Sequence, residues 1–389
     1  MTLVLAMLSM VGAWGIDAYL PSFQAIGQSL EATPVLVQQT LSVYMAALAT
    51  TVLFAGTLSD SLGRRPVVLS AVLLFAFASA WASMAEDIQS LIVARGFQGV
   101  AAGVTTVLSR TIVQDLFQGA EAQRVMSLIT MLFAIAPSIA PVVGGWLQAT
   151  LDWPSVFVML AVYASLLFWL CLRHVPESLP PEKRQPLRFG RVCSNYLQVL
   201  RHGRFMAMVL SIGLVFIGIA LYVSSAASYV VNVLKLGETD FGWMFIPVTT
   251  GMVLGASVAR RFARKVAPEH LSRTGQGVMF TACLISVLYT HAFTPTVPWA
   301  VLPLGLYAFG LSLALPSMTV ATLSLFPTMR GLAASMQSFV QMGIFSLVSA
   351  FVAPLVFHSA QALAWAHLVG LTLGIVLWGL AARIKGKPG

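Results

Sequence analysis

The sequence predicts an all-α membrane protein with twelve transmembrane helices in two pseudo-symmetric six-helix bundles. The first observation is composition: 58% of the 389 residues are hydrophobic and only 9% are charged. A soluble chain of this length needs far more charge to cover its surface. The second is a series of apolar windows, each long enough to cross a bilayer. The third is the distribution of Lys and Arg between the loops.

The apolar windows divide the chain into two halves joined by a polar segment. Arg173 to Arg204 contains four prolines and many charges, so we expect a cytoplasmic linker at 173–204. It separates an N-terminal bundle at 1–172 from a C-terminal bundle at 205–389. The predicted spans are about 3–25, 35–57, 67–85, 90–112, 124–147, 154–172, 205–231, 241–260, 273–292, 298–321, 331–355 and 361–381.

The Lys and Arg residues fix the predicted orientation. With a cytoplasmic N-terminus, twenty of the 22 lie in or beside cytoplasmic loops; Lys235 lies outside and Arg95 lies within a span. This bias predicts a multi-pass membrane protein with both termini in the cytoplasm. It also accounts for the net charge of +9 without a nucleic-acid partner. The first span has no basic region before it, so we expect no cleavable signal peptide. It begins at residue 3, which suggests that a short N-terminal stretch is missing.

The two halves echo each other. Gly56 to Arg65 follows the second span, and Gly255 to Arg264 follows the eighth. Each segment places a glycine nine residues before an arginine at a cytoplasmic helix exit. This pattern fits duplicated halves that rock around a central cavity.

Asp17 is the only one of the thirteen acids that lies well inside a predicted span. Intramembrane carboxylates are costly and usually carry ions or protons. Arg95 in the fourth span belongs to the same outer half of the membrane, so we expect it to be the counter-charge. The pair predicts proton coupling. The alternative is a permanent ion pair that only fixes helix packing.

Two further motifs predict conformational roles. Asp60, Arg64 and Arg65, with Gly56 and Gly63, form a charged turn after the second span. Charges at such a turn clamp neighbouring helices or bind a helix N-terminus. We expect Arg110 and Asp115, at the inner end of the fourth span, to be its partners. The alternative is an ordinary basic loop with a tight glycine turn.

The fifth span carries two prolines four residues apart, Pro137 and Pro141, followed by Gly144 and Gly145. Proline removes a helix donor, and small residues allow close packing. We expect a bend or a close crossing at the interface between the halves. A plain kink is the alternative.

Neutral and aromatic side chains dominate the polar positions of the spans, which suits a flat, lipophilic ligand. Each of these residues could instead serve packing alone. The candidate substrate-binding residues are Tyr19, Tyr44, Gln98, Tyr222, Ser225, Tyr229, Asn232, Tyr307, Gln337 and Gln341.

The sequence argues against an enzyme. The six histidines lie at loops or span ends without metal-ligand spacing, and the three cysteines form no metal or disulfide framework. We find no phosphate-binding loop, so we expect no metal and no cofactor. A membrane receptor or scaffold is an alternative of another class, and it predicts that ligand binding is not linked to proton movement.

With these motifs the chain resembles the major facilitator superfamily, the twelve-helix drug:H⁺ antiporter group, and its Bcr/CflA (bicyclomycin and chloramphenicol resistance) subfamily. The resemblance runs nearly end to end. It rests on Asp17 to Pro21, Gly56 to Pro66, Arg95 to Gly99, Pro141 to Gly145 and the linker Pro176 to Pro186.

The resemblance implies a monomeric multidrug efflux transporter in which the proton motive force drives rocker-switch export of small lipophilic drugs. It implies that Asp17 binds and releases the transported proton and that Arg95 takes part in coupling this protonation to transport. It also implies that Asp60, Arg64 and Asp115 lock the outward-facing state by docking against the eleventh helix near Gly331. A metabolite exporter or importer of the same fold is the alternative, because fold does not choose substrate.

Two positions depart from the family pattern. Ala136 and Ala140 stand where the fifth-helix motif usually has glycine, which suggests looser packing. Ser9 stands where some multidrug exporters have a second acid, which suggests one proton per cycle.

Overall fold

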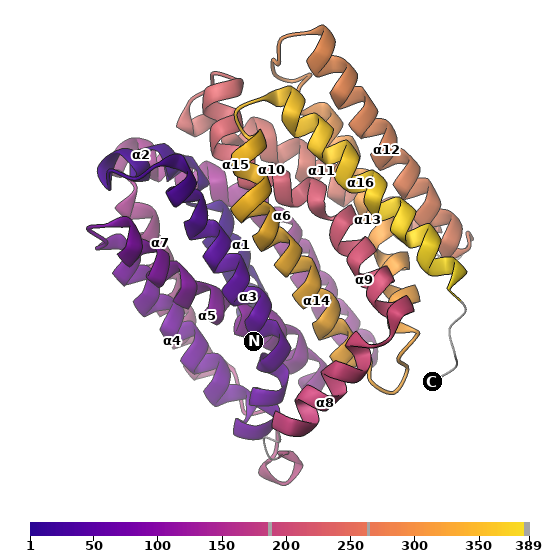
Figure 1. The fold of residues 1–389 in the computed structure, drawn as a ribbon. Helices are drawn as coiled ribbons and strands as arrows, with labels where there is room; N and C mark the ends of the chain where they lie inside the picture. The colour runs from indigo at the N-terminus through magenta and orange to yellow at the C-terminus, as the bar shows by residue number, and fades with distance from the viewer. Residues whose placement is uncertain (186–188, 263–264, 385–389) are drawn as a thin grey trace. The chain divides into compact units, whose positions relative to one another are not determined.

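The computed structural model of the chain describes residues 1–185, 189–262 and 265–384, and these ranges contain helices and turns without a strand (Figure 1). The predicted all-α class is confirmed. Of the cations assigned to the cytoplasm, Arg188, Arg264, Lys385 and Lys387 lie outside the described residues.

The chain divides into two compact units, Met1–Arg188 and Phe189–Gly389. The helices of the first unit are α1 (Thr2–Asp17), α2 (Phe23–Ser29), α3 (Pro34–Leu62), α4 (Arg64–Ser83), α5 (Ile88–Leu116), α6 (Gly119–Leu151) and α7 (Pro154–His174). The helices of the second unit are α8 (Phe189–Leu200), α9 (Gly203–Val215), α10 (Ile217–Ser228), α11 (Gly242–Phe262), α12 (Pro268–Ala292), α13 (Leu302–Leu323), α14 (Arg330–Leu347), α15 (Ala353–Val356) and α16 (Ala360–Arg383).

Each of the twelve predicted spans coincides with helix. Within the described ranges, eleven helical segments are long and apolar enough to cross a membrane. The exception is α12, which starts with polar residues, among them Glu269, Arg273 and Gln276. Its 25-residue length still exceeds what a bilayer requires.

Three predicted spans are interrupted rather than continuous. The first ends as α-helix at Asp17 and resumes as α2 after a 3₁₀ turn at Leu20–Ser22. Pro21 lies in this turn, where its missing N–H prevents a regular helix. The seventh span breaks between α9 and α10, and the eleventh passes through a π-helical turn at Val348–Val352.

The segment predicted as a linker is more ordered than its composition suggests. It contains a 3₁₀ turn at Pro181–Lys183 and the helix α8. Helix α8 packs against α9 and α14 within the second unit. This helix was not predicted from the sequence, because the prolines that precede it indicated an irregular linker.

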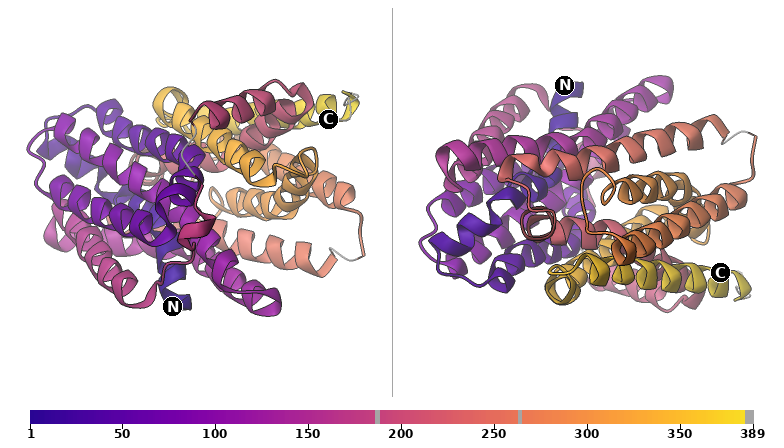
Figure 2. Two further views of the ribbon diagram at one scale, coloured as in Figure 1. Left: turned by 90° about the horizontal axis from the view of Figure 1, so that it is seen from below. Right: turned by 90° about the horizontal axis from the view of Figure 1, so that it is seen from above.

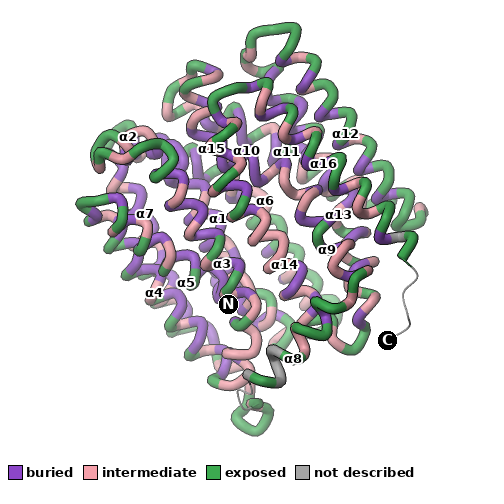
Figure 3. Tube along the Cα trace, in the orientation of Figure 1, coloured by how far each residue is buried: buried purple, intermediate pink, exposed green. Residues whose placement is uncertain are grey.

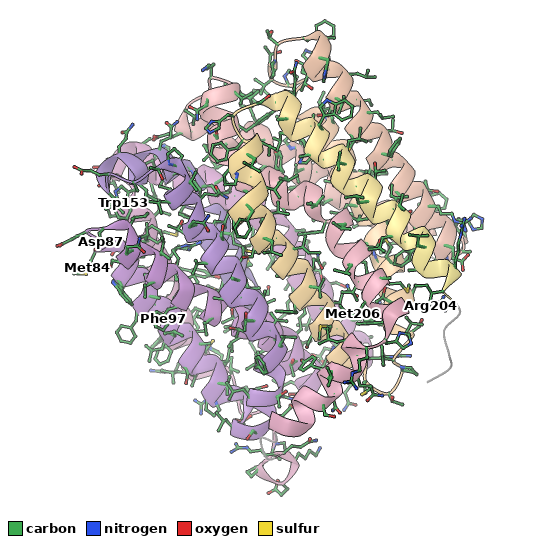
Figure 4. The ribbon with its side chains drawn as sticks, in the orientation of Figure 1. Met84, Asp87, Phe97, Trp153, Arg204 and Met206 are labelled. Atoms are coloured by element: carbon green, nitrogen blue, oxygen red, sulfur yellow. The ribbon has the colours of Figure 1, made fainter. Side chains whose placement is uncertain are left out.

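Burial follows the helix contacts within each unit. In the first unit, α5 packs closely on α3 and α4. Figure 2 shows the helices of this unit, in indigo and purple, from below and from above. Buried stretches of α1 and α5 contrast with the mainly half-buried or exposed α14 of the second unit (Figure 3). Met84 and Phe97 point away from the first unit (Figure 4) and are 77% and 44% exposed. Such apolar outer surfaces suit contact with lipid.

Candidate functional site

Asp17 is the last residue of α1, at the point where the first span is interrupted. Its side chain is buried, with 4% exposure. A carboxylate moved out of water is unstable unless a cation or hydrogen-bond donors accompany it. The position therefore makes the protonation state of Asp17 sensitive to its neighbours.

Gly144 of α6 packs directly on this interruption. A Cβ atom at Gly144 would lie 1.7 Å from the carbonyl oxygen of Ala18, the residue after Asp17. Only glycine permits this approach between α6 and the turn. The close crossing expected of the fifth span thus involves α1 of the same unit. Ala136 and Ala140 are fully buried on α6.

The α6 helix continues through both of its prolines, Pro137 and Pro141, from Gly119 to Leu151. Pro141, Gly144 and Gly145 are buried and Pro137 is half-buried. Of the buried members, Gly144 contacts the turn after α1.

Arg95 lies fully buried on α5 between two tyrosine rings. Its guanidinium carbon is 4.1 Å from the ring centre of Tyr19 and 4.3 Å from that of Tyr44. A desolvated cation over an aromatic face gains about 2 kcal/mol or more from each ring. These two tyrosines, predicted as substrate residues, thus compensate the burial of a charge.

Gln98 extends this cluster towards α4. It accepts a hydrogen bond from Nη1 of Arg95 at 2.6 Å and donates from Nε2 to the hydroxyl of Ser79 at 2.7 Å. Because Gln98 and Ser79 are both fully buried, the chain of bonds is isolated from solvent. It fixes the side of the guanidinium that faces α4.

Arg95 and Asp17 do not form an ion pair. The described residues contain three ion pairs, and neither Asp17 nor Arg95 takes part in any of them. Tyr44 lies within electrostatic reach of both groups. The permanent ion pair that the sequence left open as an alternative is therefore not seen in this structure.

At the other end of the first unit, Arg64 is the centre of a charged cluster. It forms ion pairs with Asp60 at 2.5 Å and with Asp115 at 3.0 Å, and it donates to the hydroxyl of Ser59 at 2.6 Å. The structure thus brings together Asp60, Arg64 and Asp115. Arg110 takes part in no ion pair of the described residues, so it is not the partner we expected.

Glu177 belongs to this cluster, and the sequence analysis missed it. Its Oε1 accepts from the backbone N–H of Arg64 at 2.9 Å, and its Oε2 from that of Arg65 at 3.3 Å. It therefore caps the N-terminus of α4, which has no acid in its first turn. Ser178 adds a hydrogen bond to Asp115 at 3.0 Å. The uncapped helix start after Gly63 was the signal that could have indicated a capping acid.

Gly63 makes this cap possible. Its φ of +101° lies in a region that favours glycine, and a Cβ atom there would lie 2.5 Å from Oε2 of Glu177. Gly56 lies about one turn before Ser59, whose hydroxyl donates to its carbonyl at 2.8 Å, and a Cβ atom at Gly56 would meet nothing within 4 Å. Arg65 donates to the carbonyl of Leu172 at 2.9 Å, which ties the end of α7 to the start of α4.

Glu177→Gln should lower the thermal stability of the protein, because the amide retains one acceptor but loses the charge that complements the helix N-terminus. We expect a loss of about 1 kcal/mol, given that Glu177 is partly exposed. The melting temperature in detergent measures it. Glu182→Gln, in the same segment and exposed, is the control. Equal melting temperatures for the two variants would contradict a capping role.

In the second unit, the predicted substrate residues have varied surroundings. Tyr222 and Tyr307 are buried, and their hydroxyls donate to the carbonyls of Met244 and Val215 respectively. Ser225 and Tyr229 are also buried. Gln337 donates to Thr319 at 3.0 Å and Asn232 to Ser228 at 3.2 Å, while Gln341 is half-buried.

His367 lies inside α16 and is 3% exposed, so its expected position at a span end is wrong. Its ring stacks on Tyr307 with 6.2 Å between ring centres. The residue is six positions into the predicted span at 361–381, which was the signal for an interior location. Tyr307 and His367 together pack near the break between α9 and α10.

Comparisons with known proteins agree with this fold. The sequence profile of the Major Facilitator Superfamily matches residues 2–354. The chain is 28% identical over 286 residues to the Bicyclomycin resistance protein homolog of Haemophilus influenzae, covering 74% of this chain and 72% of that protein. It is 26% identical over 339 residues to the Multidrug transporter MdfA of Escherichia coli O157:H7, covering 86% and 81%.

Among solved structures, the D-xylose-proton symporter superposes with a TM-score of 0.75 at 17% identity, covering 100% of this chain and 99% of that one. This likeness concerns the fold alone. The family and its solved neighbour are transporters and not enzymes, and the helices are those of a multi-pass membrane protein. As its resemblance predicted, the chain belongs to the Major Facilitator Superfamily.

Proposed function

We propose that this chain is a proton-coupled multidrug efflux transporter that exports small lipophilic compounds by rocker-switch alternating access. Membership of the superfamily supports transport, and relatives named for bicyclomycin and multidrug resistance support export of drugs. The observation that carries the proposal is Asp17, the only carboxyl well inside a predicted span, which is buried at a helix interruption and shares Tyr44 as an electrostatic neighbour with the buried Arg95.

Asp17 is the proposed proton carrier, and Arg95 is the residue that couples its protonation to the cycle. A buried carboxyl without a nearby cation is stable as the neutral acid, whereas an approaching guanidinium stabilises the carboxylate. A change in the distance between Asp17 and Arg95 therefore binds or releases a proton. Ser9 lies on the same helix with its hydroxyl bonded to the carbonyl of Ala6, and a single carboxyl implies one proton per cycle.

The proposal includes the placement of the protein. The positive-inside bias supports a bacterial inner-membrane location with both termini in the cytoplasm. The proton motive force is the proposed energy source, and the protein is proposed to act as a monomer. The candidate substrate residues of the second unit, with Tyr222 and Tyr307 foremost, are proposed to contribute aromatic surface for a lipophilic ligand.

A drug-susceptibility panel tests the proposed function. We expect an efflux-deficient bacterium that expresses this chain to tolerate higher concentrations of several unrelated compounds, with bicyclomycin, chloramphenicol and ethidium as probes. Expression of Asp17→Asn at the same level should give no protection. Protection against no compound, together with altered uptake or release of one metabolite, would favour the metabolite transporter instead.

Asp60→Asn should shift the conformational balance towards the inward-facing state, because Arg64 then loses one of its two carboxylate partners. Asp60 is 46% exposed, so we expect a shift of no more than about 1 kcal/mol, or about fivefold. Labelling of a single cysteine introduced on the periplasmic side measures the balance. Glu269→Gln, at another cytoplasmic helix start, is the control. Unchanged labelling in Asp60→Asn would exclude a role for this carboxylate in the clamp.

A further inference from the structure

Aromatic rings, rather than a carboxylate, stabilise the buried Arg95 cation. Tyr19 comes from the turn after α1 and Tyr44 from α3, and both rings face the guanidinium at 4.1 and 4.3 Å. All three side chains are fully buried. The rings are fixed in place, because Tyr19 bonds to the hydroxyl of Thr40 at 3.2 Å and Tyr44 donates to the carbonyl of Gly12 at 3.1 Å.

The guanidinium retains unused hydrogen-bonding capacity. Nη1 donates to Gln98, whereas Nε and Nη2 have no partner among the described residues. A buried guanidinium with free donors is unusual, since its desolvation is then only partly compensated. Asp17 carries a carboxyl that can accept such bonds, and Tyr44 interacts electrostatically with both Arg95 and Asp17.

We propose that Tyr19 and Tyr44 are positioning residues that hold the Arg95 guanidinium while Asp17 carries its proton, and that yield it to Asp17 when the proton leaves. This inference rests on the proposed role of Asp17 as proton carrier. In this proposal the two aromatic rings set the equilibrium between two positions of the guanidinium, one against the rings and one against the Asp17 carboxylate.

The physical basis is a competition for one cation. An aromatic face attracts a guanidinium through its quadrupole and needs no formal negative charge. A carboxylate attracts it more strongly, but only once the proton has left. The rings thus stabilise the position that Arg95 occupies while Asp17 is protonated, and they weaken its tendency to pair with the Asp17 carboxylate. Weaker rings leave the guanidinium more available, so Asp17 would bind its proton only at lower pH.

The other elements packed around the site contribute no competing charge. Helix α4 reaches Arg95 through the neutral Ser79 and Gln98. Helix α6 carries charged residues only in its first turns, at Glu121 and Arg124. In α7, the hydroxyl of Tyr163 donates to the carbonyl of Met7, nearly three turns before Asp17 in α1. Tyr19, Tyr44 and Asp17 are therefore the titratable groups close to the guanidinium in the described part of the chain.

A pH titration of the substrate-free protein by infrared spectroscopy tests the inference. The observed signal is the C=O band of a protonated carboxyl that is lost in Asp17→Asn. Tyr44→Phe keeps the ring, and phenylalanines with one, two and three ring fluorines at position 44 weaken its negative face at nearly constant size. The same series at Phe97, exposed on α5, is the control.

We take Tyr44→Phe as the reference, because it shares the absence of the hydroxyl with the fluorinated series, and we expect that series to move the midpoint stepwise to lower pH relative to it. The full series should move it by about one unit, a tenfold change in proton affinity. In an Arg95→Gln background the series should have no effect. A midpoint that ignores ring fluorination, with Asp17 still titrating, would overturn the positioning role alone. The absence of any band that depends on Asp17 would overturn the proposed proton carrier as well.

Discussion

Asp17→Asn should abolish efflux driven by a pH gradient, because asparagine matches the shape of aspartic acid but carries no exchangeable carboxyl proton. In proteoliposomes loaded with ethidium, we expect transport to fall to the level of protein-free vesicles. Binding of ethidium should change by less than about threefold, or under 1 kcal/mol, because the fold does not depend on an ion pair at Asp17.

Ser9→Ala is the matched control for this experiment. Ser9 lies in the same helix and is buried, and its hydroxyl donates to the local backbone carbonyl of Ala6. We expect this variant to retain pH-gradient-driven efflux. Retained gradient-driven efflux by Asp17→Asn would exclude Asp17 as the proton carrier, whatever its effect on drug binding.

Gly144→Ala should disrupt the first unit more than any other single methyl group. The added Cβ would lie 1.7 Å from the carbonyl oxygen of Ala18 and 2.6 Å from its carbonyl carbon. Both atoms belong to the backbone, so no side-chain rotation relieves the contact, and α6 must move away from the turn beside Asp17. We expect a destabilisation of about 3 kcal/mol, the upper end of the usual range for overpacking.

The thermal melting temperature in detergent and efflux in cells measure this effect. Gly277→Ala is the control, because Gly277 lies in a helix and a Cβ atom there meets nothing within 4 Å. That variant should melt and transport like the wild type. A normal melting temperature with lost efflux in Gly144→Ala would mean that the crossing serves movement rather than stability. A normal melting temperature together with normal efflux in Gly144→Ala would contradict the close approach of α6 to α1.

The sequence predicted the helices well but not their interruptions. Apolar windows located each span, since the cost of placing polar groups in hydrocarbon depends on composition along the chain. The break after Asp17 was within reach, because Pro21 lies four residues later. The break between α9 and α10 contains no proline, and the hydroxyl of Tyr307 satisfies the carbonyl of Val215 there. A contact between residues so distant in sequence leaves no local pattern.

The candidate site shows the same division. Asp17, Arg95 and Arg64 were predicted because charges stand out in apolar or tightly turned segments. The expected pair of Arg64 with Asp115 is present, whereas the described residues show no ion pair between Arg95 and Asp17. Arg95 faces two tyrosines instead of Asp17, and Arg64 shares its helix start with Glu177, which lies more than a hundred residues further along the chain.

The sequence by itself determined that the chain crosses the membrane many times and that one acid and one arginine lie in the interior of its spans. Hydrophobicity and charge are properties of single residues, so their order along the chain is sufficient for these conclusions. The tertiary structure decided which side chains surround the arginine, how closely α6 meets the turn after Asp17, and which acid caps α4. Those features depend on the distances between helices. The contact of Gly144 with the backbone of the turn after α1, and of the tyrosine rings with Arg95, forms only when the helices pack, so it leaves no local pattern in the sequence.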